Sequence, residues 1–245
     1  MEIKPPAKPY EQGSLETLKF DKRRDAYWRS IRHILGMGYD PADLIHHAPA
    51  FAGHMNIGRY LALYEAYKMA LPYAGHIAEA GMYLGTGSIL FAKLTRLFEP
   101  ESLTLVLGFD WFKGAQGRGE EEHLVSPGAY AESVERVREL INIQGLDDVI
   151  RINNLDLAND LPKYFSDHPS LQFKLVFLDC GYLDVVRAGI NNFWPRLTPG
   201  GILLFDNFNH ETAPGETQAV RELLPHEPIR TFPFAFQPTA YIVKR

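Results

Sequence analysis

From residue 76 onward the chain alternates short apolar runs with amphipathic segments. The runs have the length of buried strands, and they cover residues 76–80, 103–109, 149–153, 175–178 and 202–205. Between them, residues 88–98, 129–144 and 185–193 carry apolar positions at helical spacing. A succession of strands and helices of this kind is typical of a parallel sheet with helices on both faces.

The two flanks follow other patterns. Residues 1–20 show no period, residues 21–37 are predicted to form a charged helix, and residues 40–51 match no clear element. A further helix is predicted over 59–71, on an apolar stripe made of Tyr60, Leu63, Tyr64, Tyr67 and Leu71. Residues 229–236 and 239–243 predict a closing antiparallel hairpin. The expected fold is therefore a doubly wound, mostly parallel α/β sheet of about seven strands. We expect a main domain over 56–245 and an N-terminal arm with helices over 1–55.

Composition excludes several classes of partner. The formal net charge is −5, from 25 basic and 30 acidic residues, so neither nucleic acid nor an anionic membrane is an expected partner. The single cysteine excludes an intrachain disulfide. The first residues lack the apolar core of a signal peptide, and no apolar run approaches the ~18 residues of a membrane span. We expect a soluble cytoplasmic protein.

Oxygen-bearing side chains stand at the ends of two neighbouring apolar runs. Asp179 follows the run at 175–178, and Asp206 and Asn207 follow the run at 202–205. If both runs are adjacent parallel strands, the three side chains meet at the sheet edge where open α/β sheets bind ligands. Two carboxylates and an amide oxygen suit Mg²⁺, Mn²⁺ or Ca²⁺. Each residue taken alone is also a common turn former.

A glycine-rich turn follows the first strand of the alternating region. Its glycines are spaced G-x-x-x-G-x-G from Gly81, which departs from the G-x-G-x-x-G pattern that binds a pyrophosphate. Glu79 precedes the first glycine and adds negative charge, which suits a cationic ligand. S-adenosylmethionine carries a sulfonium, an amino group and a single carboxylate, so the turn favours this cofactor over a dinucleotide. The alternative is a tight turn without a ligand.

Two further acids lie at positions where nucleotide folds bind a nucleoside. Asp110 ends the second strand, where a carboxylate can accept the hydroxyls of a ribose, and Trp111 beside it is predicted to lie near the adenine. Asp156 is predicted to accept a hydrogen bond from the adenine amino group. Asp110 is equally compatible with a turn, and Asp156 with a surface loop.

In this order the motifs resemble the macrocin O-methyltransferase family. The resemblance covers residues 56–245. The motifs are Glu79-x-Gly81-x-x-x-Gly85-x-x-Ser88, Asp110 to Gly114, Leu178-Asp179, Leu197 to Gly201, Asp206-Asn207-Phe208, and Pro214-Gly215-x-x-Gln218-Ala219-Val220. Members of that family are class I, Rossmann-like enzymes of secondary metabolism. They use S-adenosylmethionine and a divalent metal to methylate hydroxyls on natural-product sugars. The family has an Asp-Asp pair where this chain has Asp206-Asn207, which looks like the set of catechol-type enzymes.

The resemblance implies a role for each matching residue. The metal, expected to be Mg²⁺, would be held by Asp179, Asp206 and Asn207. The cofactor-binding set is Glu79, Gly81, Tyr83, Gly85, Ser88, Asp110, Trp111, Asp156 and Asp179. The base that takes the proton of the acceptor hydroxyl is left open among Asp179, His123 and His210, with Asp184 as a further option.

Two other functions remain open from the sequence. One is a catalytically silent relative that uses the site for binding, and the other is a dinucleotide-dependent oxidoreductase on a similar sheet. The expected partner is a small hydroxylated molecule. A homo-oligomer built through residues 1–55 is a further possibility.

Overall fold

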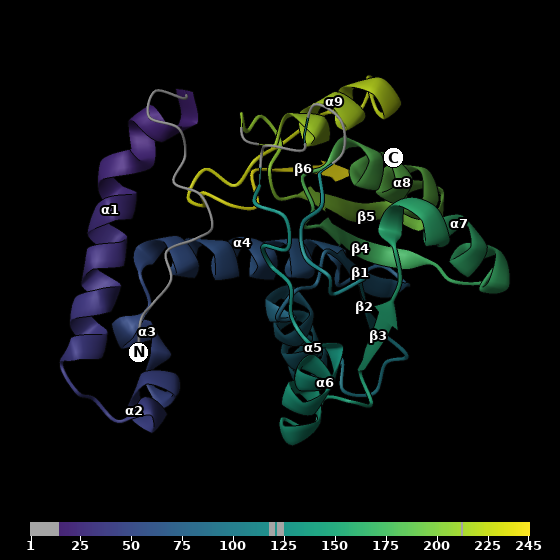
Figure 1. Ribbon diagram of the computed structural model, residues 1–245. Helices are drawn as coiled ribbons and strands as arrows, with labels where there is room; N and C mark the ends of the chain where they lie inside the picture. The colour runs from purple at the N-terminus through teal and green to yellow at the C-terminus, as the bar shows by residue number, and fades with distance from the viewer. Residues whose placement is uncertain (1–14, 118–120, 122–124, 212) are drawn as a thin grey trace.

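A single six-stranded sheet organises the protein (Figure 1). The computed structural model describes residues 15–117, 121, 125–211 and 213–245. Within them the strand order is β3-β2-β1-β4-β5-β6. The strands are β1 His76–Ala80, β2 Val106–Asp110, β3 Ile150–Asn154, β4 Phe173–Leu178, β5 Leu197–Phe205 and β6 Ala240–Val243. Strands β1 to β5 run parallel, and β6 pairs antiparallel with β5.

Helices cover both faces of this sheet, which confirms the doubly wound fold (Figure 1). One face packs against α4 His54–Ala70, α5 Thr86–Phe98 and α6 Val134–Ile143. The other packs against α7 Leu157–Asp167, α8 Leu183–Phe193 and α9 Pro214–Leu223. Successive strand residues point to opposite faces, so Leu175 joins the first core and Val176 the second. The strands are apolar throughout because both faces are covered.

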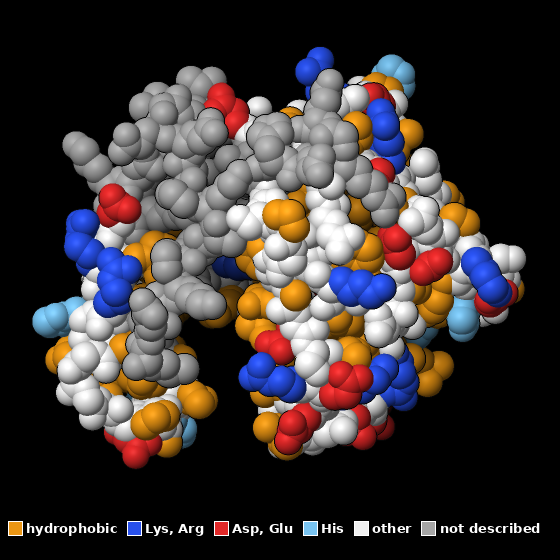
Figure 2. All heavy atoms as spheres, in the orientation of Figure 1, with side chains coloured by type: hydrophobic (Ala, Val, Ile, Leu, Met, Phe, Trp, Pro, Cys, Tyr) orange, Lys and Arg blue, Asp and Glu red, His pale blue; other side chains and the backbone are white. Residues whose placement is uncertain are grey.

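The N-terminal helices stand beside this body. They are α1 Leu15–Gly36, α2 Pro41–His46 and α3 Ala48–Phe51. Figure 2 shows an open gap between α2 and α3 on one side and α5 and α6 on the other. Neither α2 nor α3 has a buried residue. Contact with α4 is made by Tyr27, whose hydroxyl donates to Asn56 and whose ring lies against Gly53. The division at residue 55 stays a prediction, and α4 begins at His54.

Two surface features bear on partners. In Figure 2, Lys and Arg side chains are interspersed with Asp and Glu side chains over the face that carries α6 and α7. Among the residues that the structure describes, no helix has the length and apolar character that crossing a bilayer requires.

The predicted count of about seven strands was wrong, because the part of the chain that the structure describes forms six strands and no closing hairpin. Residues 229–236 contribute one isolated bridge, between Arg230 and Tyr241. Pro233 has no N–H to donate to a ladder. The segment packs instead through Phe232, whose ring stacks on that of Tyr241 with centroids 4.6 Å apart.

Helix predictions also needed correction. Among the described residues four helices were not predicted: α2 and α3 in the unassigned segment 40–51, α7, which contains Pro162, and α9. Helix α6 begins only at Val134, because the Ser133 side chain accepts from Arg136 N and caps it. The buried face of α4 differs in part from the predicted apolar stripe. Leu63 and Tyr67 are buried as predicted, but Tyr60 is 38% exposed, and Ala62 and Ala66 are buried instead.

A buried ion pair lies near the amino end of β4, at the opposite end of the strand from the predicted site. Lys174 is 1% exposed, and its Nζ donates to Glu99 Oε2 at 2.5 Å and to Thr104 Oγ1 at 3.2 Å. The Tyr67 hydroxyl donates to the other Glu99 oxygen at 2.7 Å. Burial on its own would raise the pKa of Glu99, but these donors lower it. The network links α4, α5 and β4.

Replacing Lys174 should therefore destabilise the fold strongly. The Lys174→Met variant leaves Glu99 buried without its cation, and we expect a loss of about 3–5 kcal/mol in the free energy of unfolding by urea titration. The matched control is Lys163→Met, which removes an exposed pair with Asp167 on α7 and should cost less than about 0.5 kcal/mol. Equal losses in both variants would contradict this interpretation of the network.

Candidate functional site

The strand ends bring the three predicted metal ligands side by side. Leu178, the last residue of β4, pairs with Phe205, the last residue of β5, so Asp179 and Asp206 leave the sheet as neighbours. Asp179 N donates to Ala80 O at 2.8 Å, and Asp206 N donates to Leu178 O at 3.1 Å. The carboxylates therefore sit at the carboxyl edge of the central strands.

Arg59 of α4 lies between these two carboxylates. Its Nη2 donates to Asp179 Oδ2 at 2.6 Å, and its Nη1 donates to Asp206 Oδ1. Burial disfavours the charge of Arg59, but Asp206 and Asp179 outweigh it and raise the pKa of the guanidinium. For Asp179 the pKa lies well above its usual range, because burial and the Asp206 carboxylate outweigh the attraction of Arg59.

Gln237, from the segment before β6, completes the cluster. Its Nε2 donates to Asp206 Oδ2 and to Asn207 Oδ1, both at 2.8 Å. Four oxygens of the cluster thus accept from a nitrogen donor: both carboxylate oxygens of Asp206, one of Asp179 and the amide oxygen of Asn207. The residue types suit a hard cation. Their arrangement does not fit one, because the Arg59 guanidinium, itself a cation, already bridges the two carboxylates. Among the described residues, no group of three or more His, Cys, Asp and Glu side chains is arranged to hold a metal.

Behind the cluster lies a buried carboxylate, Glu216, in the first turn of α9. It accepts from Asn207 N at 2.6 Å and is fully buried. Burial and the nearby Asp206 raise its pKa well above the usual range. This bond fixes the turn that carries Asn207 against the start of α9.

The glycine turn is held from behind by Glu79. Glu79 is 1% exposed, and its Oε2 accepts from Ser88 N at 2.6 Å and Ser88 Oγ at 2.5 Å. Burial raises the pKa of Glu79 to about 7, although the two bonds from Ser88 favour the charged form and by themselves would lower the pKa. The bonds tie β1 to the start of α5, so the structure places Glu79 and Ser88 as supports of the turn. Their contact with a cofactor stays a prediction.

Two glycines give the turn its shape. Gly81 has φ of 93°, and a Cβ there would collide with the carbonyl oxygen of Asp179. Gly85 has φ of 80° and caps α5. A left-handed backbone at both positions favours glycine. The turn therefore packs directly against the strand end that carries Asp179.

Asp110 faces the same turn from the end of β2. Its Oδ2 accepts from Tyr83 N at 2.8 Å, and its Oδ1 accepts from Phe112 N at 2.7 Å. Trp111 Nε1 donates to Gly114 O at 2.9 Å. Asp110 is therefore bonded to Tyr83 of the turn, and the contact of Tyr83, Asp110 and Trp111 with a cofactor stays a prediction.

A family model described as a methyltransferase domain matches residues 78–208, which span the glycine turn, Asp110, Asp179 and Asp206. The chain belongs to this methyltransferase domain family.

A curated relative is 8-demethyl-8-(2,3-dimethoxy-alpha-L-rhamnosyl)-tetracenomycin-C 4'-O-methyltransferase of Streptomyces olivaceus. It is 26% identical over 147 residues, which are 55% of this chain and 53% of the relative. The alignment thus spans about half the length of that protein.

Solved structures share the fold across the methyltransferase domain and beyond it. The calicheamicin methyltransferase CalS11 superposes with a TM-score of 0.77 at 23% identity, covering 99% of this chain and 98% of that one. The apo form of CalS11, described as a TDP-rhamnose 3'-O-methyltransferase, has a TM-score of 0.72 at 23% identity and covers 91% and 94%. The O-methyltransferase NovP has a TM-score of 0.59 at 18% identity and covers 75% and 79%. These likenesses establish the shared Rossmann-like fold.

Asp156 has a local role at the edge of the methyltransferase domain's sheet. Its Oδ1 accepts from Ala158 N at 2.9 Å, and its Oδ2 accepts from Asn159 Nδ2 at 2.7 Å. These bonds make it the N-cap of α7, the helix that the sequence did not predict. The adenine contact stays a prediction.

The candidate bases lie in different places. His123 falls outside the described residues. Asp184 is in the first turn of α8, where its Oδ1 accepts from Val185 N at 2.8 Å. His210 is 4% exposed, and its ring centroid lies 6.0 Å from that of Phe236. Only Asp179, of these four, lies in the cluster bonded to Arg59.

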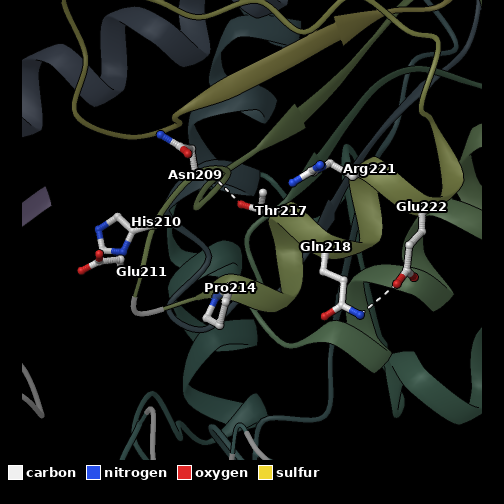
Figure 3. A pocket seen from close by; sticks show the side chains of 8 residues that line it. All are labelled: Asn209, His210, Glu211, Pro214, Thr217, Gln218, Arg221 and Glu222. Carbon is white, nitrogen blue, oxygen red and sulfur yellow. Dashed lines mark hydrogen bonds between the residues drawn. The ribbon is translucent and has the colours of Figure 1, made fainter. Parts of the chain in front are cut away.

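His210 lines a hollow of about 830 Å³ along α9 (Figure 3). In Figure 3 the helix contributes most of the lining side chains, and the Thr217 hydroxyl accepts from Asn209 N at 2.6 Å. The lining residues are Asn209, His210, Glu211, Pro214, Thr217, Gln218, Arg221 and Glu222.

Sequence reasoning missed Arg59 and Gln237. A signal for Arg59 was present, because helical spacing puts it on the same face as Ala62, Leu63 and Ala66, all of them buried. A charged side chain on the buried face of a helix is almost always paired with an opposite charge. Gln237 gave no comparable signal, since its position depends on where the closing segment folds back.

Burial of Glu79 predicts a pH dependence of stability. Its pKa is raised in the folded protein, so the folded state binds the proton more tightly than the unfolded chain. Its contribution to stability therefore falls as pH rises from the ordinary value of 4.5 to about 7, by up to about 3 kcal/mol. Glu79→Gln removes this titration and keeps an acceptor for Ser88.

Urea unfolding at about pH 5 and about pH 8 measures the effect. We expect Glu79→Gln to gain stability relative to the wild type only at the higher pH. Glu139→Gln, on the exposed face of α6, is the control and should track the wild type. Parallel pH curves for Glu79→Gln and the wild type would disprove the assignment.

Proposed function

We propose that this protein is an S-adenosylmethionine-dependent O-methyltransferase that acts on a sugar hydroxyl of a natural product. The observation that carries the proposal is the glycine turn of a methyltransferase-family domain, packed against Asp179 and faced by Asp110. The sugar acceptor is supported by the tetracenomycin relative, named for a 4'-O-methyl transfer on a rhamnosyl derivative, and by the TDP-rhamnose activity in the name of CalS11.

The turn has the features that the cofactor needs. Each carboxylate oxygen of Asp110 accepts one backbone N–H, and each has a further lone pair for a ribose hydroxyl. Tyr83, 36% exposed, and Trp111 flank that carboxylate and offer apolar surfaces beside an adenine. Gly81 and Gly85 let the chain approach a ligand closely. S-adenosylmethionine supplies an activated methyl group on a sulfonium.

In the proposed reaction the acceptor oxygen displaces the sulfur from the methyl carbon. The carbon–sulfur bond breaks, a carbon–oxygen bond forms, and the hydroxyl proton passes to a base. Of the candidates, Asp179 is favoured by position, because its backbone touches Gly81 of the turn. Its raised pKa makes this carboxylate a stronger base than an ordinary aspartate. The protein would otherwise contribute alignment and the exclusion of water.

Magnesium dependence stays a prediction. The residues that would hold the ion are Asp179, Asp206 and Asn207, but their oxygens accept from Arg59 and Gln237. No step of the proposed reaction is therefore assigned to a metal. The cytoplasmic location, the absence of nucleic-acid and membrane partners, and a homo-oligomeric state also stay predictions from the sequence.

Calorimetry and an acceptor assay test the proposal. We expect the protein to bind S-adenosylmethionine and not NAD, and to methylate TDP-rhamnose or a rhamnosyl-tetracenomycin, detected by mass spectrometry. Asp110→Asn should weaken cofactor binding by about tenfold or more, because a charged acceptor for the ribose is lost. Asp167→Asn, at the exposed end of α7, is the control. A folded protein that binds NAD, or neither ligand, would contradict the proposal.

A further inference from the structure

The cation of the acid pair is supplied by the protein itself. Arg59 and Gln237 together place four N–H contacts on Asp179, Asp206 and Asn207. We propose that Arg59 is the resident cation of the Asp179–Asp206 pair, and that a divalent ion enters this pair only by displacing the guanidinium. The proposal concerns ion binding alone and is independent of the methyl-transfer proposal.

Charge balance supports this role. Two carboxylates that leave adjacent strand ends repel each other unless a cation lies between them. The side chain of Asp206 is 6% exposed, so water screens that charge poorly. Arg59 bonds to both acids through two separate nitrogens, so one planar guanidinium bridges the two carboxylates with a charge-assisted hydrogen bond to each.

Contacts other than those with the two acids also hold the Arg59 guanidinium in place. The Arg59 Cζ lies 5.3 Å from the centroid of the Phe177 ring, and the side chain is 22% exposed. Its neighbour Gly58 lies so close to the Phe234 backbone that a Cβ there would come within 2.9 Å of the carbonyl oxygen. The buried Ala62 and Leu63 anchor the next turn of α4. Displacement of Arg59 therefore involves its side chain and leaves α4 where it packs.

A competing ion would have to replace these contacts. It competes with Arg59 for the carboxylates of Asp206 and Asp179, and it adds positive charge beside the guanidinium. Both effects weaken ion binding as long as Arg59 is in place. Removing the charge at position 59 should then strengthen it.

The test is a titration of Mn²⁺ alone into the metal-free protein, without cofactor or acceptor, followed by calorimetry and by electron paramagnetic resonance of the free ion. We expect Arg59→Gln to bind Mn²⁺ at least about tenfold more tightly than the wild type. Arg96→Gln makes the same change in net charge at an exposed pair with Asp148, and it should match the wild type. Equal affinities of the wild type and Arg59→Gln would overturn the proposal.

Two further measurements keep the test decisive. The double variant Arg59→Gln, Asp206→Asn should lose the gained affinity, which places the ion on the acid pair. If it keeps the gained affinity, the ion binds elsewhere and the proposal fails. If Arg59→Gln does not fold, Arg59→Met, which also removes the charge but keeps a long side chain, is used. Tighter Mn²⁺ binding by Arg59→Met than by the wild type supports the proposal, and equal binding overturns it.

Discussion

Parallel pairing of β4 with β1 on one side and β5 on the other is the constraint on which the site depends. Because the three strands run the same way, their carboxyl ends meet at one edge, and the residues that follow them must share a small space. Gly81 after β1, Asp179 after β4 and Asp206 after β5 are in contact for this reason. The apolar strands make the pairing stable, and the polar residues just beyond them carry the chemistry.

The acids at the carboxyl ends of these strands lie close together and repel one another. Asp179, Asp206 and Glu216 lie close enough that burial and mutual repulsion raise the pKa values of Asp179 and Glu216. Arg59 offsets part of this repulsion, and a backbone N–H of Asn207 supports Glu216. The site is therefore built around a surplus of negative charge, which suits a cationic methyl donor approaching from the glycine turn.

Local patterns predicted most of the sheet. The strand at His76–Ala80 was placed to the residue, and the strand ends at Asp110, Asp179 and Asp206 were recognised, because short apolar runs bounded by polar residues are typical of buried strands. Helices α7 and α9 were missed, since Pro162 and the Pro214-Gly215 start resemble loop residues. Arg59 and Gln237 bond to acids 147 and 31 residues away, and such contacts depend on tertiary packing that periodicity does not describe.

The two donors of the acid cluster come from opposite ends of the main domain, Arg59 before the first strand and Gln237 just before the last. During synthesis the acids are made well before Gln237, so a nascent chain that has folded β1 to β5 still lacks the donor that bonds Asp206 and Asn207. Docking of β6 on β5 brings Gln237 into place. Completion of the polar cluster therefore coincides with completion of the sheet, and a product shortened before residue 237 would hold an acid pair without one of its two partners.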